Sequence, residues 1–292
     1  MRCKRLSIVL AWVLLTGCSN SPDKKIVIGS KNFTEQLILA ELMAQHIEAK
    51  TDLKVERRLN LGGTFVCHQG LLSGELDLYP EYTGTAYSAI LKLPPLNDPP
   101  KVYEKTQQNY NQRFGLEWTE PLGFNNTFAM VVRQEDAQRL KLKTLSDAAK
   151  YTPKWVAGVG YEFADRADGL PGLSKAYGLK FSEPPRTMDL GLIYRALTAK
   201  QVDMVAGNST DGILSRLNLV ILKDDKRYFP PYQAAPVVRQ QTLQKYPELR
   251  EALRDLGDRI SEAEMQKMND QVDSQKQDMK KVVEEFRRAN SL

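Results

Sequence analysis

The sequence feature that most constrains the fold is an alternation of short apolar strands with helical patterns near the N-terminus. Three strands and two intervening helices are expected at residues 25–29, 32–50, 55–61, 62–74 and 76–79. Asn32 and Glu35 are placed as a capping box at the start of the first helix. This order predicts a parallel sheet with right-handed crossovers, and therefore an α/β fold.

The rest of the chain repeats this organisation with more irregular stretches. Further strands are expected at residues 123–132, 155–159, 202–206, 219–222 and 236–238, with a helix around residues 190–199. Four prolines between residues 93 and 100 predict a loop there. Two charged amphipathic helices are expected to end the chain, and Ser261 with Glu264 forms a capping box in the second.

The first 18 residues have the pattern of a secretory signal: a basic start, an apolar run and small residues before Cys18. The apolar run is shorter than the roughly 20 residues that a membrane-spanning helix needs. Residues 15–18 (Leu-Thr-Gly-Cys) resemble the lipobox of bacterial lipoproteins, which implies a signal peptide over 1–17, lipid on Cys18 and a polar tether over 18–23. The alternative is a plain secreted protein in which Cys18 has no such role.

Charge and composition exclude several classes of function. The chain has 292 residues, of which 42% are hydrophobic and 26% charged, as in a soluble globular protein. Its net charge of +5 falls to +2 once the three basic leader residues Arg2, Lys4 and Arg5 are removed. Because no basic run remains, nothing in the sequence favours binding to nucleic acid.

The cysteine and histidine content gives little support to catalysis or metal binding. Once Cys3 leaves with the leader and Cys18 is acylated, Cys67 is the remaining thiol, and a buried packing role is expected for it. Cys67 and His68 are adjacent on a helix, so their side chains diverge by about 100°. His46 lies on an apolar stripe and is expected to be a core histidine with its hydrogen bonds satisfied. No nucleophile, nucleotide-binding or zinc motif occurs, so we expect no enzyme activity, no cofactor and no metal.

Several segments, in order along the chain, resemble the substrate-binding proteins of osmoprotectant ABC importers. These are the glycine betaine, carnitine and choline binding proteins of the OpuC, ProX or OsmF type. The matching segments are residues 29–36 (GSKNFTEQ), 74–85 (GELDLYPEYTGT), 121–127 (PLGFNNT), 161–163 (YEF), 209–212 (STDG) and 229–236 (FPPYQAAP). The resemblance therefore spans nearly all of the chain beyond the leader.

This resemblance implies a two-lobed periplasmic-binding-protein fold of type II. Each lobe is expected to be a mainly parallel sheet flanked by helices, and two hinge strands are expected to join the lobes. On the family pattern, lobe one comprises residues 24–128 and 229–292, and lobe two comprises residues 129–228. Ligand would bind between the lobes and stabilise their closed arrangement.

The chemistry of such a ligand explains which residue types the site needs. A trimethylammonium group has no N–H to donate, so aromatic faces must hold it, each contributing roughly 0.5–2 kcal/mol. The resemblance places the family's aromatic box on Tyr82, Phe128, Asn208 and Tyr232. Asn208 departs from the family, which usually has an aromatic residue there, and Phe128 keeps a ring but loses a hydroxyl.

The other end of a betaine or carnitine is a carboxylate, which needs basic groups, hydroxyls or backbone N–H groups. The resemblance assigns this tail to Lys31, Thr85 and Arg166, and it places Asn126 beside the box. Tyr161 is a further candidate wall residue.

Structural roles are the alternative for the most prominent of these side chains. Tyr82 and Tyr232 could plug strand ends, and Phe128 could belong to the core. Lys31 could be only a charge at a helix start, and Arg166 could pair with Asp165 or Asp168.

The function that follows is that of an extracytoplasmic lipoprotein that captures a quaternary-amine osmoprotectant and delivers it to an ABC permease. We expect a monomer that is held at a bacterial membrane surface by its lipid anchor. One alternative keeps the fold but senses a ligand without transport. A second alternative is a binder of a different small zwitterion.

Overall fold

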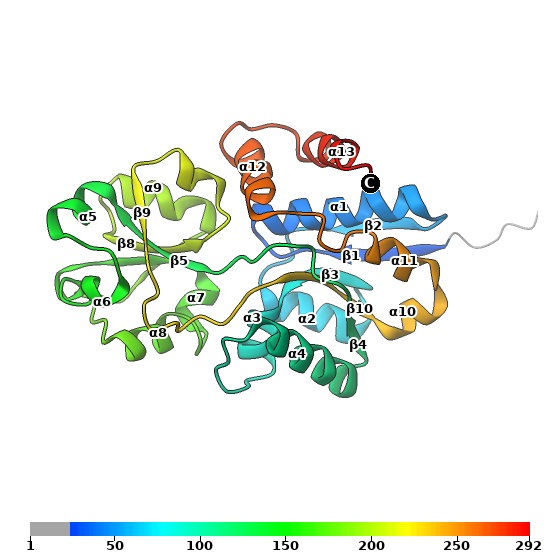
Figure 1. The fold of residues 1–292 in the computed structure, drawn as a ribbon, viewed down its shortest axis with the longest axis horizontal. Helices are drawn as coiled ribbons and strands as arrows, with labels where there is room; N and C mark the ends of the chain where they lie inside the picture. The colour runs from blue at the N-terminus through cyan, green and yellow to red at the C-terminus, as the bar shows by residue number, and fades with distance from the viewer. Residues whose placement is uncertain (1–23) are drawn as a thin grey trace, which may run out of the picture.

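The protein has two lobes, each built on a five-stranded sheet (Figure 1). This computed structural model describes residues 24–292, so the expected signal segment 1–17, the tether 18–23 and Cys18 lie outside the described residues. The sheet of lobe one has the strand order β2-β1-β3-β10-β4, and the sheet of lobe two has the order β7-β6-β8-β5-β9. The strands are β1 (Lys25–Gly29), β2 (Lys54–Arg58), β3 (Leu78–Tyr82), β4 (Leu116–Trp118), β5 (Phe128–Arg133), β6 (Ala157–Val159), β7 (Arg186–Thr187), β8 (Met204–Asn208), β9 (Leu219–Leu222) and β10 (Ala234–Arg239).

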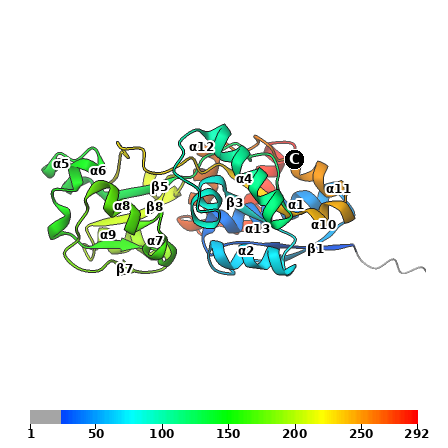
Figure 2. The same cartoon turned by 90° about the horizontal axis from the view of Figure 1, so that it is seen from below.

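Helices flank both sheets (Figures 1 and 2). Lobe one contains α1 (Thr34–Lys50), α2 (Thr64–Ser73), α3 (Thr83–Thr85), the π-helix η1 (Ala86–Ile90), α4 (Pro99–Phe114), α10 (Gln240–Lys245), α11 (Glu248–Arg254), α12 (Glu262–Asp273) and α13 (Met279–Ala289). Lobe two contains α5 (Gln134–Leu140), α6 (Leu145–Ala148), η2 (Thr152–Lys154), α7 (Tyr161–Asp165), α8 (Leu170–Tyr177), η3 (Leu190–Leu192), α9 (Ile193–Thr198) and η4 (Gly212–Ser215).

Each sheet is parallel apart from one strand. In lobe one β10 runs antiparallel to β3 and β4, and in lobe two β5 runs antiparallel to β8 and β9. These are the two strands that the chain enters after crossing from the other lobe, so each begins at the interlobe edge, where the parallel strands end (Figure 1). The predicted two-lobed α/β fold with mainly parallel sheets is confirmed.

The two segments that cross between the lobes pair with each other before they enter their sheets. The Leu122 amide donates to the Ala234 carbonyl at 2.8 Å, and the Asn126 amide donates to the Tyr232 carbonyl at 3.0 Å. Asn125 and Gln233 form an antiparallel bridge. A two-stranded connection of this kind lets the lobes rotate about one line while it resists their sliding apart.

The start of α1 differs from the prediction. Phe33 occupies the N-cap position and makes no capping hydrogen bond through its side chain, so the expected box of Asn32 and Glu35 is wrong. Glu35 is buried, and its carboxylate accepts hydrogen bonds from distant segments instead of from the helix start. By contrast, the capping box of Ser261 and Glu264 at α12 is confirmed.

The proline-rich loop ends earlier than predicted, because Pro99 and Pro100 begin helix α4. Proline is tolerated in a first helical turn, where the backbone N–H groups have no partner within the helix. Asp98 caps this helix by accepting a hydrogen bond from the Lys101 amide at 3.1 Å. The C-terminal region also holds more helices than the two expected, since α10 to α13 all follow β10.

Cys67 and both histidines lie inside lobe one. Cys67 is fully buried and free, which confirms its packing role, and burial raises the pKa of its thiol to about 12. His68 packs edge-on against Tyr110 and Phe114. His46 is buried as predicted, but the expectation of satisfied hydrogen bonds is wrong, because neither ring nitrogen has a partner among the described residues. The Asp255 carboxylate lies 3.8 Å from His46 Nε2.

We expect His46 to make the protein less stable in mild acid. Burial, aided by the nearby charges of Arg287 and Lys50, lowers the pKa of His46 from 6.5 to about 4 in the folded protein. As the pH falls from 6.5 to about 4, the unfolded chain therefore takes up this proton before the folded protein does. The free energy of unfolding falls by about 1–2 kcal/mol near pH 5 as a result. Urea unfolding near pH 7 and pH 5 should show a smaller pH-dependent loss for His46→Leu than for the unchanged protein. Equal losses in both proteins would contradict this assignment.

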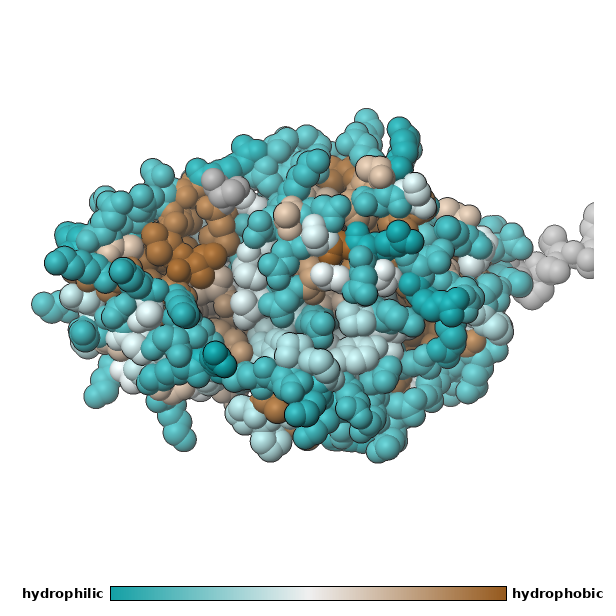
Figure 3. All heavy atoms as spheres, in the orientation of Figure 1, coloured by the Kyte–Doolittle hydropathy of each residue, from teal (hydrophilic) through white to brown (hydrophobic). Residues whose placement is uncertain are grey.

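The face of the molecule seen in Figure 3 is mostly hydrophilic. An apolar area lies on the face of lobe two that carries β9, where Ile221 is exposed. Within residues 24–292, no helix is long and apolar enough to cross a membrane.

Candidate ligand-binding site

A cavity of about 160 Å³ lies between the two lobes. Its walls come from the ends of β3 and β8, from the segments that follow β1, β2, β3, β6 and β7, and from residues at or just before the starts of β5 and β10. Because parallel strands end at one edge of a sheet, and the reversed strand of each sheet begins at that edge, all these loops converge. The volume suits a small molecule.

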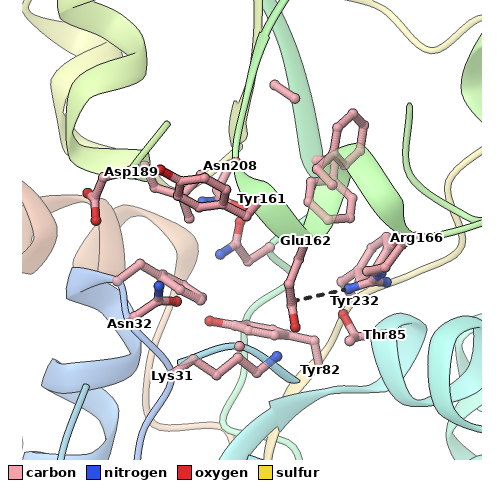
Figure 4. Close-up of a pocket in the computed structure, with 18 of the residues that line it drawn as sticks. Lys31, Asn32, Tyr82, Thr85, Tyr161, Glu162, Arg166, Asp189, Asn208 and Tyr232 are labelled. Atoms are coloured by element: carbon pink, nitrogen blue, oxygen red, sulfur yellow. Dashed lines mark ion pairs between the residues drawn. The ribbon is translucent and has the colours of Figure 1, made fainter. Parts of the chain in front are cut away.

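The structure brings all the residues predicted for the site into the lining of this cavity (Figure 4). They are Lys31, Tyr82, Thr85, Asn126, Phe128, Tyr161, Arg166, Asn208 and Tyr232. Lys31, Tyr82 and Thr85 belong to lobe one, whereas Tyr161 and Asn208 lie opposite them on lobe two (Figure 4). The residues therefore converge from segments spread over some 200 positions of sequence.

Three of the four positions of the predicted box carry aromatic rings. Tyr82 stacks on Phe33 with ring centroids 6.3 Å apart, and Phe128 meets Tyr232 edge-on at 5.5 Å. The hydroxyl of Tyr232 is buried without a hydrogen-bond partner among the described residues, and burial raises its pKa well above the usual range. These rings present faces that can attract a cation.

Lys31 is buried against lobe one and already paired. Its ammonium forms an ion pair with the Glu81 carboxylate, and it also lies 5.1 Å from the centre of the Tyr82 ring. Both side chains of this ion pair are buried. Lys31 is therefore more than a charge at a helix start, but its charge is balanced before any ligand arrives.

Arg166 is also buried and paired. Its Nε donates to Asp168 Oδ1 at 2.9 Å, and its Nη2 donates to Asp168 Oδ2 at 2.5 Å. Its Nη1 lies 3.9 Å from Glu162, and its guanidinium lies 5.7 Å from the centre of the Phe128 ring. The pairing with Asp168 considered from sequence is thus present, although Arg166 is inside the cleft and not on the outer surface.

The two asparagines predicted for the site are each hydrogen-bonded to a carboxylate behind the wall. Asn208 donates its backbone N–H to Asp211 Oδ2 at 2.9 Å. Asn126 donates its Nδ2 to Glu35 Oε1 at 2.8 Å, and the Tyr82 hydroxyl donates to the same oxygen at 2.6 Å. Glu35 and Asp211 thus form a layer behind the cavity that fixes its polar walls.

Sequence reasoning missed several lining residues. Asn32, Phe33, Glu162 and Phe163 lie within segments recognised as similar to the family, but no contact with a ligand was assigned to them. The others are two glycines, one residue of β8 and three residues of the loop after β7, which has no distinctive pattern: Gly63, Gly160, Ala206, Met188, Asp189 and Leu190. Within the described part of the chain, no group of three or more histidine, cysteine, aspartate or glutamate side chains could hold a metal ion.

Two lobes on mainly parallel sheets, joined by a paired connection and enclosing a small aromatic cavity, define the class of two-lobed solute-binding proteins. More specifically, the chain belongs to the family described as the substrate-binding domain of the ABC-type glycine betaine transport system, whose model matches residues 24–289. It is therefore a substrate-binding protein of an ABC-type transport system and not an enzyme.

Individual relatives show the extent of this similarity. The carnitine transport binding protein OpuCC of Listeria monocytogenes is 37% identical over 98% of this chain and 93% of its own length. The glycine-betaine-binding protein of Pseudomonas aeruginosa is 35% identical over 98% of this chain and 94% of its own length. A crystal structure of a glycine betaine/carnitine/choline ABC transporter is 33% identical to this chain, with a TM-score of 0.74 over 92% of this chain and 98% of its own.

Proposed function

We propose that this chain captures a quaternary-amine osmoprotectant in the interlobe cavity and delivers it to an ABC permease. The observation that carries the proposal is the convergence of Tyr82, Phe128 and Tyr232 on one small cavity. A methylated ammonium can be attracted to several ring faces at once, whereas it cannot accept or donate ordinary hydrogen bonds. The names of the relatives, which include carnitine and glycine betaine binding proteins, support the same ligand class.

The proposed mechanism is closure of the lobes around the ligand. Lobe one would comprise residues 24–128 and 229–292, and lobe two residues 129–228, with the paired crossing segments as the hinge. Ligand that touches both lobes binds the closed state more tightly than the open state, and only this difference drives closure. The closed form would then dock on the permease.

The proposed location is the outer side of a bacterial membrane. Leu15-Thr16-Gly17-Cys18 would direct lipid attachment to Cys18, and the following polar residues would tether the lobes to the bilayer. We further propose that the protein acts as a monomer, because one chain supplies walls on both sides of the cavity.

A ligand screen tests the proposed class. Choline, carnitine, glycine betaine and proline, all at one and the same concentration, should be compared by thermal unfolding. A compound whose Kd is about one hundred times lower than that concentration stabilises the fold by about 2.7 kcal/mol. We expect stabilisation by at least one methylated amine and none by proline, and an absence of any shift with the methylated amines would overturn the proposal.

The alternatives of a sensor without transport and of another zwitterion remain distinct from this proposal. Genes for an ATPase and a permease next to this one would favour import, and their absence would favour sensing. A shift with a zwitterion that lacks a methylated nitrogen would favour the second alternative.

A further inference from the structure

The cavity is backed by two carboxylates that have no cationic partner. Glu35 lies behind Tyr82 and Asn126, and Asp211 lies behind Asn208. Within residues 24–292, no lysine, arginine or histidine forms an ion pair with Glu35 or Asp211. Both are held by neutral donors alone.

Glu35 accepts four hydrogen bonds, two at each carboxylate oxygen. Oε1 accepts from the Tyr82 hydroxyl at 2.6 Å and from Asn126 Nδ2 at 2.8 Å. Oε2 accepts from the Thr210 hydroxyl at 2.5 Å and from Asn269 Nδ2 at 3.0 Å. The amide groups of Asn126 and Asn269 can only donate here, and they favour the charged form of Glu35, as do the two hydroxyls when they donate. These hydrogen bonds oppose the effect of burial, which raises the pKa of Glu35.

Asp211 is arranged in the same way on lobe two. Oδ2 accepts from the Tyr194 hydroxyl at 2.6 Å and from the Asn208 amide at 2.9 Å, and Oδ1 lies 3.4 Å from Asn208 Nδ2. Asp211 and Glu35 are close enough that the charge of Glu35 acts on Asp211. When both are ionised, two negative charges therefore lie behind the same cavity from opposite lobes.

The basic side chains of the cavity do not offset these charges. Lys31 is matched by Glu81, and Arg166 is matched by Asp168. Two more carboxylates, Glu162 and Asp189, also line the cavity. The acidic side chains around the cavity consequently outnumber the basic ones.

An unpaired acceptor points to the same ligand charge. Asn126 lines the cavity with only 6% of its surface exposed, and its Oδ1 has no hydrogen-bond partner among the described residues. A carbonyl oxygen can only accept hydrogen bonds, so it repels a carboxylate and suits a hydroxyl or the polarised methyl groups of an ammonium.

We propose that Glu35 and Asp211 are the counter-charges of the bound ammonium, and that they select a ligand with net positive charge, such as a choline-type amino alcohol, over a zwitterion with a carboxylate. This inference rests on the proposed function. Neither carboxylate needs to touch the ligand, because charges separated from it by one layer of buried side chains are only weakly screened. Glu35 and Asp211 thus act as positioning residues that hold Tyr82, Asn126 and Asn208. Their charges also make the electrostatic potential in the site more negative.

The first test compares choline with glycine betaine by isothermal titration calorimetry of the purified chain near pH 7.5. Choline should bind at least tenfold more tightly. Asp211→Asn and Glu35→Gln should each weaken choline binding by roughly tenfold and weaken glycine betaine binding less. The ratio of the affinity for choline to the affinity for glycine betaine should therefore fall in both variants. The matched control is Glu135→Gln, which removes the same charge from an exposed position on α5.

The outcomes of this test separate the inference from the function it rests on. Glycine betaine binding as tightly as choline would overturn the inference and leave the proposed function standing. No binding of any methylated amine would overturn the proposed function itself. An unchanged ratio in both folded acid variants would also overturn the role given to Glu35 and Asp211.

The second test needs no variant, so it holds even where Glu35→Gln fails to fold. Burial raises the pKa of Asp211 to about 6 and raises that of Glu35, while hydrogen bonds oppose both shifts. A bound cation favours the ionised forms of both acids, and choline itself has no group that titrates in this range. Choline should therefore bind more weakly near pH 5 than near pH 7.5. Its binding near pH 6 should release protons from the protein. Equal affinity at both pH values would overturn the inference.

The other ionisable groups around the two acids are few, which makes this readout interpretable. Tyr82 and Tyr194 face them as hydroxyl donors and stay neutral, because burial raises the pKa of both phenols well above the usual range. On α12, Asp273 accepts from the Thr34 hydroxyl at 2.5 Å, and burial raises its pKa. Asp270, on the same helix, pairs with Arg216 of lobe two. The pairing with Arg216 lowers the pKa of Asp270 to about 2, so that group stays charged over the tested range.

Discussion

Tyr82→Ala should reduce the affinity for the ligand at least a hundredfold, which corresponds to about 2.7 kcal/mol. The substitution removes a ring that lines the cavity, stacks on Phe33 and gives its hydroxyl to Glu35. The attraction between ring and cation is lost together with the donor that holds Glu35 in place. Calorimetric titration with the ligand that gives the largest thermal shift measures the change.

Two further variants separate the loss of the ring from a general loss of stability. Tyr110→Ala removes an equally large, fully buried ring from α4, away from the cavity, so it should cost stability but leave affinity nearly unchanged. Tyr82→Phe keeps the ring and removes only the hydroxyl, so it should bind more tightly than Tyr82→Ala. If Tyr82→Ala folds and binds as well as the unchanged protein, Tyr82 has no part in recognition.

The fold was predictable because its signals are local and repeat along the chain. The strand expected at residues 25–29 and the helix ending at Gly74 match β1 and α2, since each depends on a short apolar run or on a glycine in the left-handed region. The start of α4 was missed because proline is common both in loops and in the first turn of a helix. Here only the capping hydrogen bond of Asp98 distinguishes the helix start from a loop.

The candidate site was predictable only where a resemblance supplied the positions. Its residues are far apart in sequence, and nothing in the local pattern of Tyr82 or Tyr232 says that the two lobes bring them together. Glu35 illustrates the limit most clearly. Its place three residues after Asn32 predicts a helix cap, yet the side chain turns inward, because Thr210 and Asn269 provide donors that no local pattern could show.

A large effect is also expected at a contact between the lobes outside the cavity. Helix α12 of lobe one packs against η4 of lobe two, where Asn269 Nδ2 donates to the Thr210 carbonyl at 2.9 Å and Arg216 pairs with Asp270. Gly212 lies at the centre of this contact. A Cβ atom added there would lie 2.3 Å from the backbone nitrogen of Asp270 and 2.5 Å from its Cα, so a side chain cannot fit while the lobes keep this arrangement.

Gly212→Val should therefore hold the lobes apart and weaken ligand binding at least a hundredfold, without disturbing the core of either lobe. The obstruction is helix backbone, which cannot move aside as a flexible side chain could. Small-angle scattering with saturating ligand should show a larger radius of gyration for this variant, and calorimetry should show the lost affinity. Ala199→Val, which adds a branched side chain at an exposed position of lobe two, is the matched control and should change neither quantity. If Gly212→Val binds normally and keeps the compact shape, contact between α12 and η4 is not needed for the closed state, and the ligand alone holds the lobes together through the cavity.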